Sequence, residues 1–306
     1  MHSPSSDSQT SPVAATVPLH VDRPSAAATA GWQRVAHRYR VVLAPLRRPW
    51  HHRELLWELT RREILIRYRG SFLGLLWSFS QPLLMLAVYS LVFGFIFEAK
   101  WSATEAGGTP FALILFAGLI VYSLFAECAN RAPTLVLAHP GYVKKVVFPL
   151  EILPCVTIAS ALFHAAVSLA VLVLVQSALY SFPGVALLTL PFVLLPVVLF
   201  TLGVSWFLAA LGVYFRDAVH TVALFTTVVL FVSPVFYPMS ALPEPLRAYA
   251  WLNPLALVIE DLRAVLFLAA MPRWGALAAA SGFSLLIAAA GLLWFERTRP
   301  GFADVI

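Results

Sequence analysis

Few residues in this sequence have the types and spacing that enzyme chemistry requires. The sequence contains no G-x-x-x-x-G-K-[ST] loop for nucleotide phosphates and no H-E-x-x-H, G-x-S-x-G or S-x-x-K motif. The histidine pair His51-His52 is a poor metal site, because adjacent residues on a helix point about 100° apart. Four carboxylates lie near expected membrane borders: Glu127, Glu151, Asp217 and Glu260. They fall on separate loops, so they do not predict a catalytic cluster.

Ionisable residues inside the apolar stretches are also few. His164 lies within one stretch and His220 near the edge of another. Transporters driven by protons or sodium usually place carboxylates or histidines at mid-membrane. The simpler interpretation of His164 is a histidine bonded to a serine or to the backbone. If the protein moves a substrate, we therefore expect the energy to come from a partner, with no cofactor or metal on this chain. Cys128 and Cys155 form no C-x-x-C pair and are expected to be small buried residues.

The composition indicates an integral membrane protein. Of the 306 residues, 60% are hydrophobic and only 12% are charged, and the mean hydropathy is +0.82. Soluble domains are about 45–50% apolar and about 25% charged. A soluble chain could not bury this much apolar surface, so the expected fold class is an all-α integral membrane protein. A secreted enzyme, a nucleic-acid-binding domain and a disordered hub are excluded.

Uncharged runs predict six transmembrane helices, each of which needs about 20 residues. The longest run extends from Ile152 to Phe215, and the turn signal at residues 181–184 divides it into two spans. The predicted spans are 72–97, 106–126, 152–180, 185–213, 218–237 and 274–295. With their connections they form a transmembrane domain over residues 72–297.

Residues 238–273 are too interrupted to cross the bilayer. Five prolines divide this region into short apolar pieces, and Glu260, Asp261 and Arg263 lie in the middle of it. Two short re-entrant helices on the external side fit this pattern, provided that protein shields their backbone ends. Local pairing of the three charged residues is the expected arrangement, and a role as an external gate is the alternative.

Positive charge is concentrated before the first span. Residues 1–71 contain 11 arginines and 5 acidic residues, which accounts for the whole net charge of +6. Residues 1–50 lack hydrophobic periodicity and are expected to be a disordered or unassigned extension. Residues 51–71 predict an amphipathic helix in the interfacial layer. It contains four arginines that could serve as topology markers and membrane-lipid contacts: Arg61, Arg62, Arg67 and Arg69.

The distribution of basic residues sets the expected orientation. With six spans and a cytoplasmic N-terminus, the cytoplasmic segments carry 17 basic residues and the external segments carry 4. The positive-inside rule therefore predicts that both termini are cytoplasmic. Residues 298–306 would then form a short cytoplasmic tail.

Two cytoplasmic segments are more specific than plain loops. In residues 130–151, prolines divide the chain into short pieces, and residues 142–147 mix apolar with basic side chains. A short helix there would lie across the membrane surface and contact a soluble partner, whereas a solvated basic loop is the alternative. The turn over 214–217 pairs an arginine and an aspartate with two aromatics. It is either an interfacial anchor or a second contact for the partner.

Four ordered blocks of the sequence carry a family resemblance. The first, RREILIRYRGSFLGLLWSFSQPLLMLAVYSLVFGFIF, lies within residues 56–97. The others are HPGYVKKVVFPLEILP at 139–154, LGVYFRDAVH at 211–220 and SPVFYPMSALPEPLRAYAWLNPLALVIEDLRAVLF at 233–267. Together they resemble the membrane subunit of bacterial ABC-2-type polysaccharide exporters, the permeases for O-antigen, capsule and teichoic acid. The resemblance covers about residues 52–297, and the extension over 1–50 departs from the family pattern.

The resemblance implies a homodimer in the bacterial inner membrane, with six spans per subunit and two copies of a separate ATPase subunit. ATP and magnesium would bind to that partner, and this chain would catalyse no reaction. The coupling contacts with the ATPase would lie in the two cytoplasmic segments: Tyr142, Val143, Lys144, Lys145, Val146, Tyr214, Phe215, Arg216 and Asp217.

The substrate implied by the resemblance is a long polysaccharide linked to undecaprenyl diphosphate. A diphosphate needs cations at the level of the cytoplasmic headgroups, and guanidinium groups bind phosphate bidentately. The nearest supply is the arginine set of the interfacial helix: Arg61, Arg62, Arg67 and Arg69. The glycan needs a channel along which sugar rings can stack on aromatics. The candidates for its lining are Tyr89, Phe93, Phe97, Tyr122 and Phe125.

Three other functions stay open on the residues alone. An ABC-2 exporter of drugs or lipids is the closest alternative, although the block at 139–154 argues against it. A membrane-embedded transferase would need a catalytic carboxylate or histidine cluster, and a secondary transporter would need intramembrane carboxylates. Dependence on an ATPase partner separates the two ABC exporters from the other two classes. No nucleic-acid partner is expected.

Overall fold

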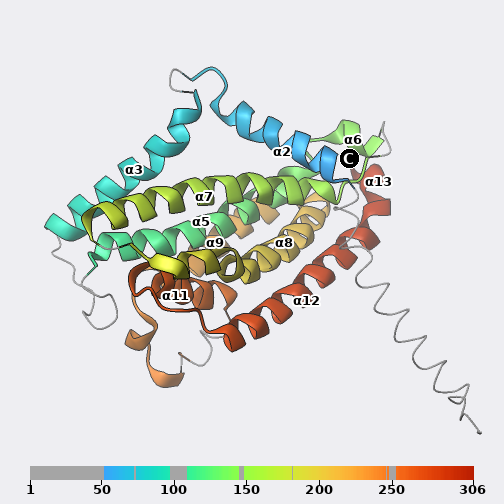
Figure 1. Cartoon of the computed structure of the whole chain (residues 1–306). Helices are drawn as coiled ribbons and strands as arrows, with labels where there is room; N and C mark the ends of the chain where they lie inside the picture. The colour runs from blue at the N-terminus through green and yellow to red at the C-terminus, as the bar shows by residue number, and fades with distance from the viewer. Residues whose placement is uncertain are drawn as a thin grey trace, which may run out of the picture. The chain divides into compact units, whose positions relative to one another are not determined.

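The computed structural model describes residues 52–71, 74–96, 109–144, 148–180, 182–245, 247 and 253–306. The extension predicted over residues 1–50 lies outside this part of the chain. Within the described residues the chain forms helices and no strand (Figure 1). The all-α fold class is therefore confirmed for this part of the protein.

Five helical stretches among the described residues are long and apolar enough to cross a membrane. They comprise α3 (Trp77–Tyr89) with η2 (Ser90–Ile96), α5 (Phe111–Leu135), α7 (Ile152–Leu179), η3 (Gly184–Thr189) with α8 (Leu190–Tyr214), and α12 (Trp274–Thr298) with η5 (Arg299–Gly301) and α13 (Phe302–Val305). Helices suit an apolar solvent because they satisfy their backbone hydrogen bonds internally. A multi-pass membrane protein is confirmed, although helix length alone does not establish six spans.

The fifth expected span, over residues 218–237, differs from the prediction. Helix α9 runs from Ala218 to Val232, and its 15 residues measure about 22 Å, less than a bilayer core of about 30 Å. It ends at Val232 rather than at Tyr237 because Pro234 has no N–H and disfavours helical backbone at Ser233, which is extended.

Helix α5 continues well past the expected end of the second span at residue 126. It reaches Leu135 and takes in Glu127 and Arg131, whose charges favoured a boundary before them. Both residues form ion pairs with helix α2 (Arg53–Tyr68), so their charges are neutralised without ending α5. The cytoplasmic region predicted over 130–151 therefore begins inside α5.

Helix α5 is the central helix of the bundle. It contacts α7, α8, α9 and α11 (Pro254–Phe267). In its most apolar stretch of 18 residues, 67% of the residues are buried within the subunit. Helices α8 and α12 approach each other most closely, because Gly203 and Gly291 let their backbones touch. In contrast, α3 lies at the periphery against α7 (Figure 1). Only 11% of the residues in the most apolar 18-residue stretch of α3 and η2 are buried.

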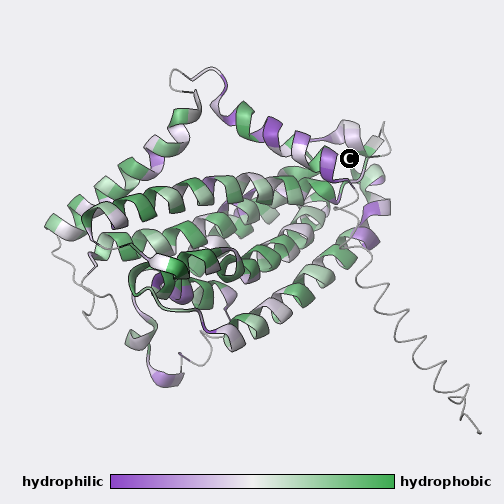
Figure 2. Cartoon of the chain, viewed as in Figure 1, coloured by the Kyte–Doolittle hydropathy of each residue, from purple (hydrophilic) through white to green (hydrophobic). Residues whose placement is uncertain are grey.

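Several helix ends meet at one end of the bundle, which we call the polar end. Ion pairs and hydrogen bonds there join α2 to α5, the start of α7 to Arg299, and the end of α8 to Thr298. The short helix α6 (Pro140–Lys144) lies there too, in contact with α13. Figure 2 shows hydrophilic residues gathered on α2 and around the junction of α12 and α13, whereas the helices between them are largely hydrophobic.

Helix α11 occupies the opposite end of α5. Asn253 caps it through a bond from the Leu255 N–H at 3.0 Å, and Pro254 fits its first turn. Nearly all of its 14 residues are buried, so protein shields this helix as the re-entrant prediction required. The other half of the predicted region contains η4 (Met239–Ala241) and is only partly described, so a second re-entrant helix stays a prediction.

Candidate functional site

Helix α2, which was predicted to be interfacial, is tied to the bundle by an ion-pair network. Arg67 Nη1 lies 2.7 Å from Glu127 Oε1, and Arg131 pairs with Glu63 at 2.6 Å and with Glu127 at 3.6 Å. A further hydrogen bond of 3.1 Å joins the Tyr68 hydroxyl to His164 Nδ1 on α7. These contacts hold the C-terminal half of α2 against α5 and α7.

The four predicted arginines do not act as one set. All four arginines are exposed, but Arg67 pairs with Glu127, whereas Arg61, Arg62 and Arg69 form no ion pair within the described residues. Those three line a groove of about 680 Å³ beside the apolar residues Leu65 and Ile66. The groove offers cations and an apolar wall together, which is the chemistry that an anionic lipid headgroup and its chain require.

A second cavity, of about 630 Å³, lies between α2, α5 and α7. Arg62, Arg67 and Arg131 line it, with His139 and Tyr142 from the segment that carries α6. Two of these three arginines are already neutralised by Glu63 and Glu127. This cavity therefore has a weaker excess of positive charge than the outer groove.

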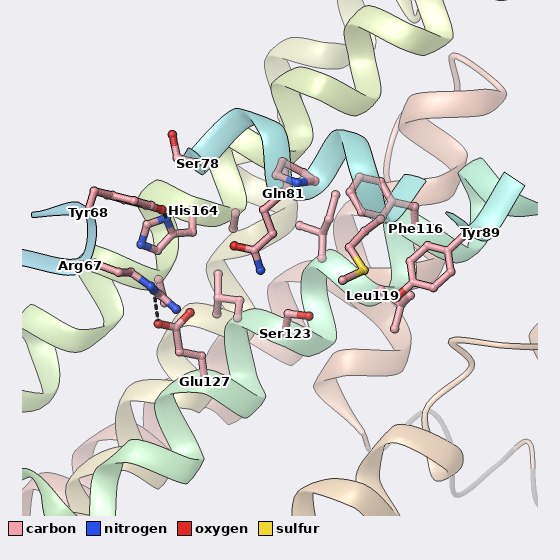
Figure 3. Close-up of a pocket in the computed structure, with 17 residues that line it drawn as sticks. Arg67, Tyr68, Ser78, Gln81, Tyr89, Phe116, Leu119, Ser123, Glu127 and His164 are labelled. Carbon is pink, nitrogen blue, oxygen red and sulfur yellow. Dashed lines mark hydrogen bonds and ion pairs between the residues drawn. The ribbon is translucent and has the colours of Figure 1, made fainter. Parts of the chain in front are cut away.

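A smaller pocket of about 200 Å³ lies beneath α3 (Figure 3). Gln81 from α3, Ser123 from α5 and His164 from α7 bring polar groups to it, and Tyr89 closes it at the far side. Burial raises the pKa of Tyr68 at its edge, so that phenol keeps its proton at neutral pH. The bond between His164 and Tyr68 corrects the expected serine or backbone partner of this histidine.

The predicted coupling residues of α6 face the protein more than the solvent. Tyr142 stacks on Phe148 with ring centroids 4.3 Å apart, and on His139 at 5.3 Å. Val143 is half-buried and packs against the same apolar cluster. Lys144 ends α6, while Lys145 and Val146 lie outside the described residues. Tyr142 and Val143 therefore help to place α6, and their contact with an ATPase partner stays a prediction.

The second predicted coupling segment forms the turn between α8 and α9. Phe215, Arg216 and Asp217 are exposed, whereas the Tyr214 hydroxyl donates to the Thr298 carbonyl at 2.8 Å. Phe302 on α13 lies next to Tyr214, with ring centroids 6.0 Å apart, and α13 also contacts α6. The segment after α12 thus lies between the two predicted coupling segments.

The aromatic residues predicted to line a channel are dispersed. Tyr89 packs against Phe93 and Phe116, with centroids 6.4 Å apart in each case. Tyr122 donates to the Thr226 carbonyl at 3.1 Å and joins α5 to α9. Phe97 lies outside the described residues.

Phe125 is a correction to the predicted channel lining. It is 1% exposed and stacks on Phe200 of α8 at 5.8 Å. A ring enclosed by two packed helices has no face for a sugar, so we assign Phe125 to the core. Of the described candidates, Tyr89 and Phe93 lie nearest to an exposed helix surface.

The predicted gate residues form fixed pairs. Arg263 pairs with Glu260 at 3.3 Å and donates to the carbonyls of Pro234 and Val235 at 2.8 and 2.7 Å. Asp261 pairs with Arg273 at 2.7 Å. These bonds join α11 to the non-helical chain after α9, which supports the structural interpretation over a gate.

The four scattered carboxylates do not assemble into a catalytic cluster. Glu127, Glu151 and Glu260 each pair with an arginine, at 2.7, 2.9 and 3.3 Å. Asp217 is exposed at the start of α9. This arrangement gives no support to a membrane-embedded transferase.

Three features of the site were missed from the sequence. They are the ion pairs of Arg131, the hydrogen bond between Tyr68 and His164, and the contacts of Arg299 and Phe302. Only the ion pairs of Arg131 had a signal in the sequence. Glu127 lies four residues before Arg131, a spacing that places both side chains on one face of a helix. The bond between Tyr68 and His164 and the contacts of Arg299 join residues more than 80 positions apart and leave no local pattern.

Comparisons with known proteins place the chain in a family. Residues 54–267 match the ABC-2 type transporter family. The "O-antigen export system permease protein RfbA" of Myxococcus xanthus is 30% identical over 263 residues, which cover 85% of this chain and 98% of that relative. A protein of the same name from Klebsiella pneumoniae is 25% identical over 254 residues, 83% of this chain and 95% of the relative. The chain therefore belongs to the ABC-2 type transporter family.

Proposed function

We propose that this protein is the permease subunit of an ATP-driven exporter that moves an undecaprenyl-diphosphate-linked polysaccharide of the O-antigen type across the inner membrane. The similarity to the Myxococcus xanthus permease over 98% of that relative carries this proposal. Two copies of the chain would assemble with two copies of an ATPase subunit that binds ATP and magnesium. The alternative is an ABC-2 exporter of drugs or lipids.

We further propose six crossings with both termini in the cytoplasm. The chain leaves the polar end at the start of α9, and Arg263 binds Pro234 and Val235 beside Ile114, near the opposite end of α5. Helix α9 and the turn that follows it would therefore traverse the bundle together. Most of the basic residues that the structure describes lie at the polar end, which would correspond to the cytoplasmic side under the positive-inside rule.

The substrate diphosphate would bind in the outer groove of α2. Arg61, Arg62 and Arg69 supply the guanidinium groups, while Leu65 and Ile66 supply an apolar wall for the isoprenoid chain. Arg67 would anchor α2 through Glu127 instead of binding the substrate. This assignment narrows the four predicted arginines to three.

The glycan path would follow the exposed side of α3 where two copies of the chain meet. Apolar side chains of α3, η2 and α9 are exposed in the single subunit, among them Leu84, Phe95, Phe225 and Phe231. Lipid or a second copy must cover them. Tyr89 and Phe93 lie at the edge of this surface and stay the candidates for stacking on sugar rings.

Depletion of the protein in its native host tests the proposed function. Mass spectrometry of lipid-linked glycans is expected to show undecaprenyl-diphosphate-linked polymer accumulating inside the cell, with a matching loss from the surface. A normal surface with no accumulation would reject glycan export. In that case, assays of drug and lipid efflux would test the alternative.

Charge reversal in the outer groove, Arg61→Glu with Arg62→Glu, is expected to reduce glycan export by about tenfold or more. Both residues are exposed on α2, so the abundance and dimerisation of the variant should stay near wild type. Export is measured as surface glycan per permease in a membrane blot. The matched control is Arg53→Glu with Arg297→Glu, two other exposed arginines. Wild-type export by the groove variant would exclude the diphosphate site.

Charge reversal at the C-terminal end of α6, Lys144→Glu with Lys145→Glu, is expected to weaken docking of the ATPase subunit. Two basic residues at a cytoplasmic contact contribute through charge complementarity, so the loss should be about tenfold and depend on salt. Co-purification of the ATPase subunit at two salt concentrations measures it, with the same Arg53 and Arg297 control. Unchanged co-purification at low salt would remove these lysines from the interface.

A further inference from the structure

The segment after α12 was expected to be a short tail, but one of its side chains is as buried as the core. The turn η5 and helix α13 carry residues 299–305, and Phe302 is 0% exposed. Its ring meets Phe295 edge to face at 5.4 Å and Tyr214 at 6.0 Å. A Cβ added to Gly301 would lie 2.5 Å from the Tyr214 hydroxyl, so the backbone passes directly over that residue. We call residues 299–306 the brace segment.

The brace segment holds the connection between α6 and α7 through Arg299. Its Nη1 binds Glu151 Oε2 at 2.9 Å, and its Nη2 donates to the Phe148 carbonyl at 2.9 Å. The Glu151 side chain is 6% exposed, so removal of Arg299 would leave a buried carboxylate without this partner. The Trp206 indole N–H donates to the Glu151 carbonyl at 2.9 Å, which adds a bond from α8.

These contacts continue from the membrane helices into α6. Phe148, whose carbonyl Arg299 binds, stacks on Tyr142 of α6 with ring planes 13° apart. Phe302 belongs to the same apolar cluster as Phe148, with Tyr142 and Val143 packed against it. Residues from α8 and α12 complete the cluster. Helix α6 has only five residues, too few to hold a position on its own.

We propose that the brace segment holds α6 in register with the ends of α8 and α12, and that Arg299 is a positioning residue for energy coupling. A displacement of α6 would then move the membrane helices instead of bending the connecting loop. The part about coupling rests on the proposed function, because it takes α6 to contact the ATPase subunit. The part about positioning does not.

The first test measures positioning in the permease alone. Arg299→Gln removes the ion pair while keeping a side chain of similar length. Amide hydrogen exchange of the peptide over 140–151 is expected to rise by about tenfold, because that segment opens locally more often. The matched control is Arg297→Gln, an exposed arginine of α12 two positions earlier. Wild-type exchange over 140–151 in Arg299→Gln would overturn the proposal.

The second test measures coupling in the full complex with the ATPase subunit. Arg299→Glu and Glu151→Arg are each expected to lower surface glycan per ATP hydrolysed by about tenfold, because each leaves a buried charge without its partner. ATPase co-purification and ATP hydrolysis should stay within about twofold of wild type. The double variant with the exchanged pair, Arg299→Glu with Glu151→Arg, is expected to restore the ratio of surface glycan to ATP hydrolysed to at least about half of its wild-type value.

The outcomes separate the brace from a simple contribution to stability. If the double variant exports no more glycan per ATP hydrolysed than either single variant, coupling through this pair is overturned. The same holds if export and ATP hydrolysis fall equally in the single variants. If the reversed variants fail to accumulate, Arg299→Gln and Glu151→Gln replace them, and a wild-type ratio in both overturns the proposal. If the wild-type permease binds no ATPase subunit, the proposed function fails, and the hydrogen-exchange test still decides the positioning part.

Discussion

Gly291→Val is expected to prevent the folded permease from accumulating in the membrane. A Cβ on Gly291 would overlap the carbonyl oxygen of Gly203, and that atom belongs to the backbone of α8, so no side-chain rotation relieves the clash. The two helices would have to separate, and overpacking of this kind costs about 1–3 kcal/mol or more. Separation would also open the cluster that holds α6, because Leu292 and Phe295 belong to it.

Membrane abundance and the size-exclusion profile in detergent measure this effect. Gly282→Val and Gly275→Val are matched controls on the same helix, since a Cβ at either position meets nothing within 4 Å in the subunit. Both are expected to accumulate within about twofold of wild type. Gly291→Val at wild-type abundance, with an unchanged profile, would show that α8 and α12 are not packed through this glycine.

Hydrophobic runs predicted the helices well and their ends poorly. The uncharged stretch from Ile152 to Phe215 became α7 and α8 with a break at the predicted turn, because backbone groups in an apolar solvent must bond within their own helix. Helix α5 passed its expected end because Glu127 and Arg131 found partners on α2. Such partners are distant in sequence, so a rule that ends spans at charges fails there.

The residue types of the candidate site could be predicted from the sequence, but the neighbours that their side chains contact could not. The arginines of α2 were recognised as cations for an anionic group, yet in the structure Arg67 pairs with Glu127 of α5. Phe125 was grouped with Tyr122 by type and position, but it faces α8 while Tyr122 reaches α9. A helix surrounded by other helices is apolar on every side, so periodicity does not say which neighbour a side chain meets.

Arg263→Ala is expected to destabilise the fold more than any other single charge removal on α11. The change leaves Glu260 without its partner and withdraws the donors from the carbonyls of Pro234 and Val235, where the chain is not helical. Removing one partner of a buried pair costs about 3–5 kcal/mol. We expect a large fall in the thermal unfolding temperature in detergent, followed by tryptophan fluorescence, and low abundance in the membrane.

The same variant separates a structural role from a gate. The matched control is Arg216→Ala, an exposed arginine that should leave the unfolding temperature unchanged. Glu260→Gln keeps an acceptor for Arg263 and should lose less stability than Arg263→Ala. A gate residue would behave differently, because its removal leaves folding intact and makes export faster, slower or leaky. Normal stability of Arg263→Ala with altered export would therefore favour the gate. Lost stability would identify Arg263 as a structural residue, whose bonds hold the chain after α9 at membrane depth although the helix has ended at Val232.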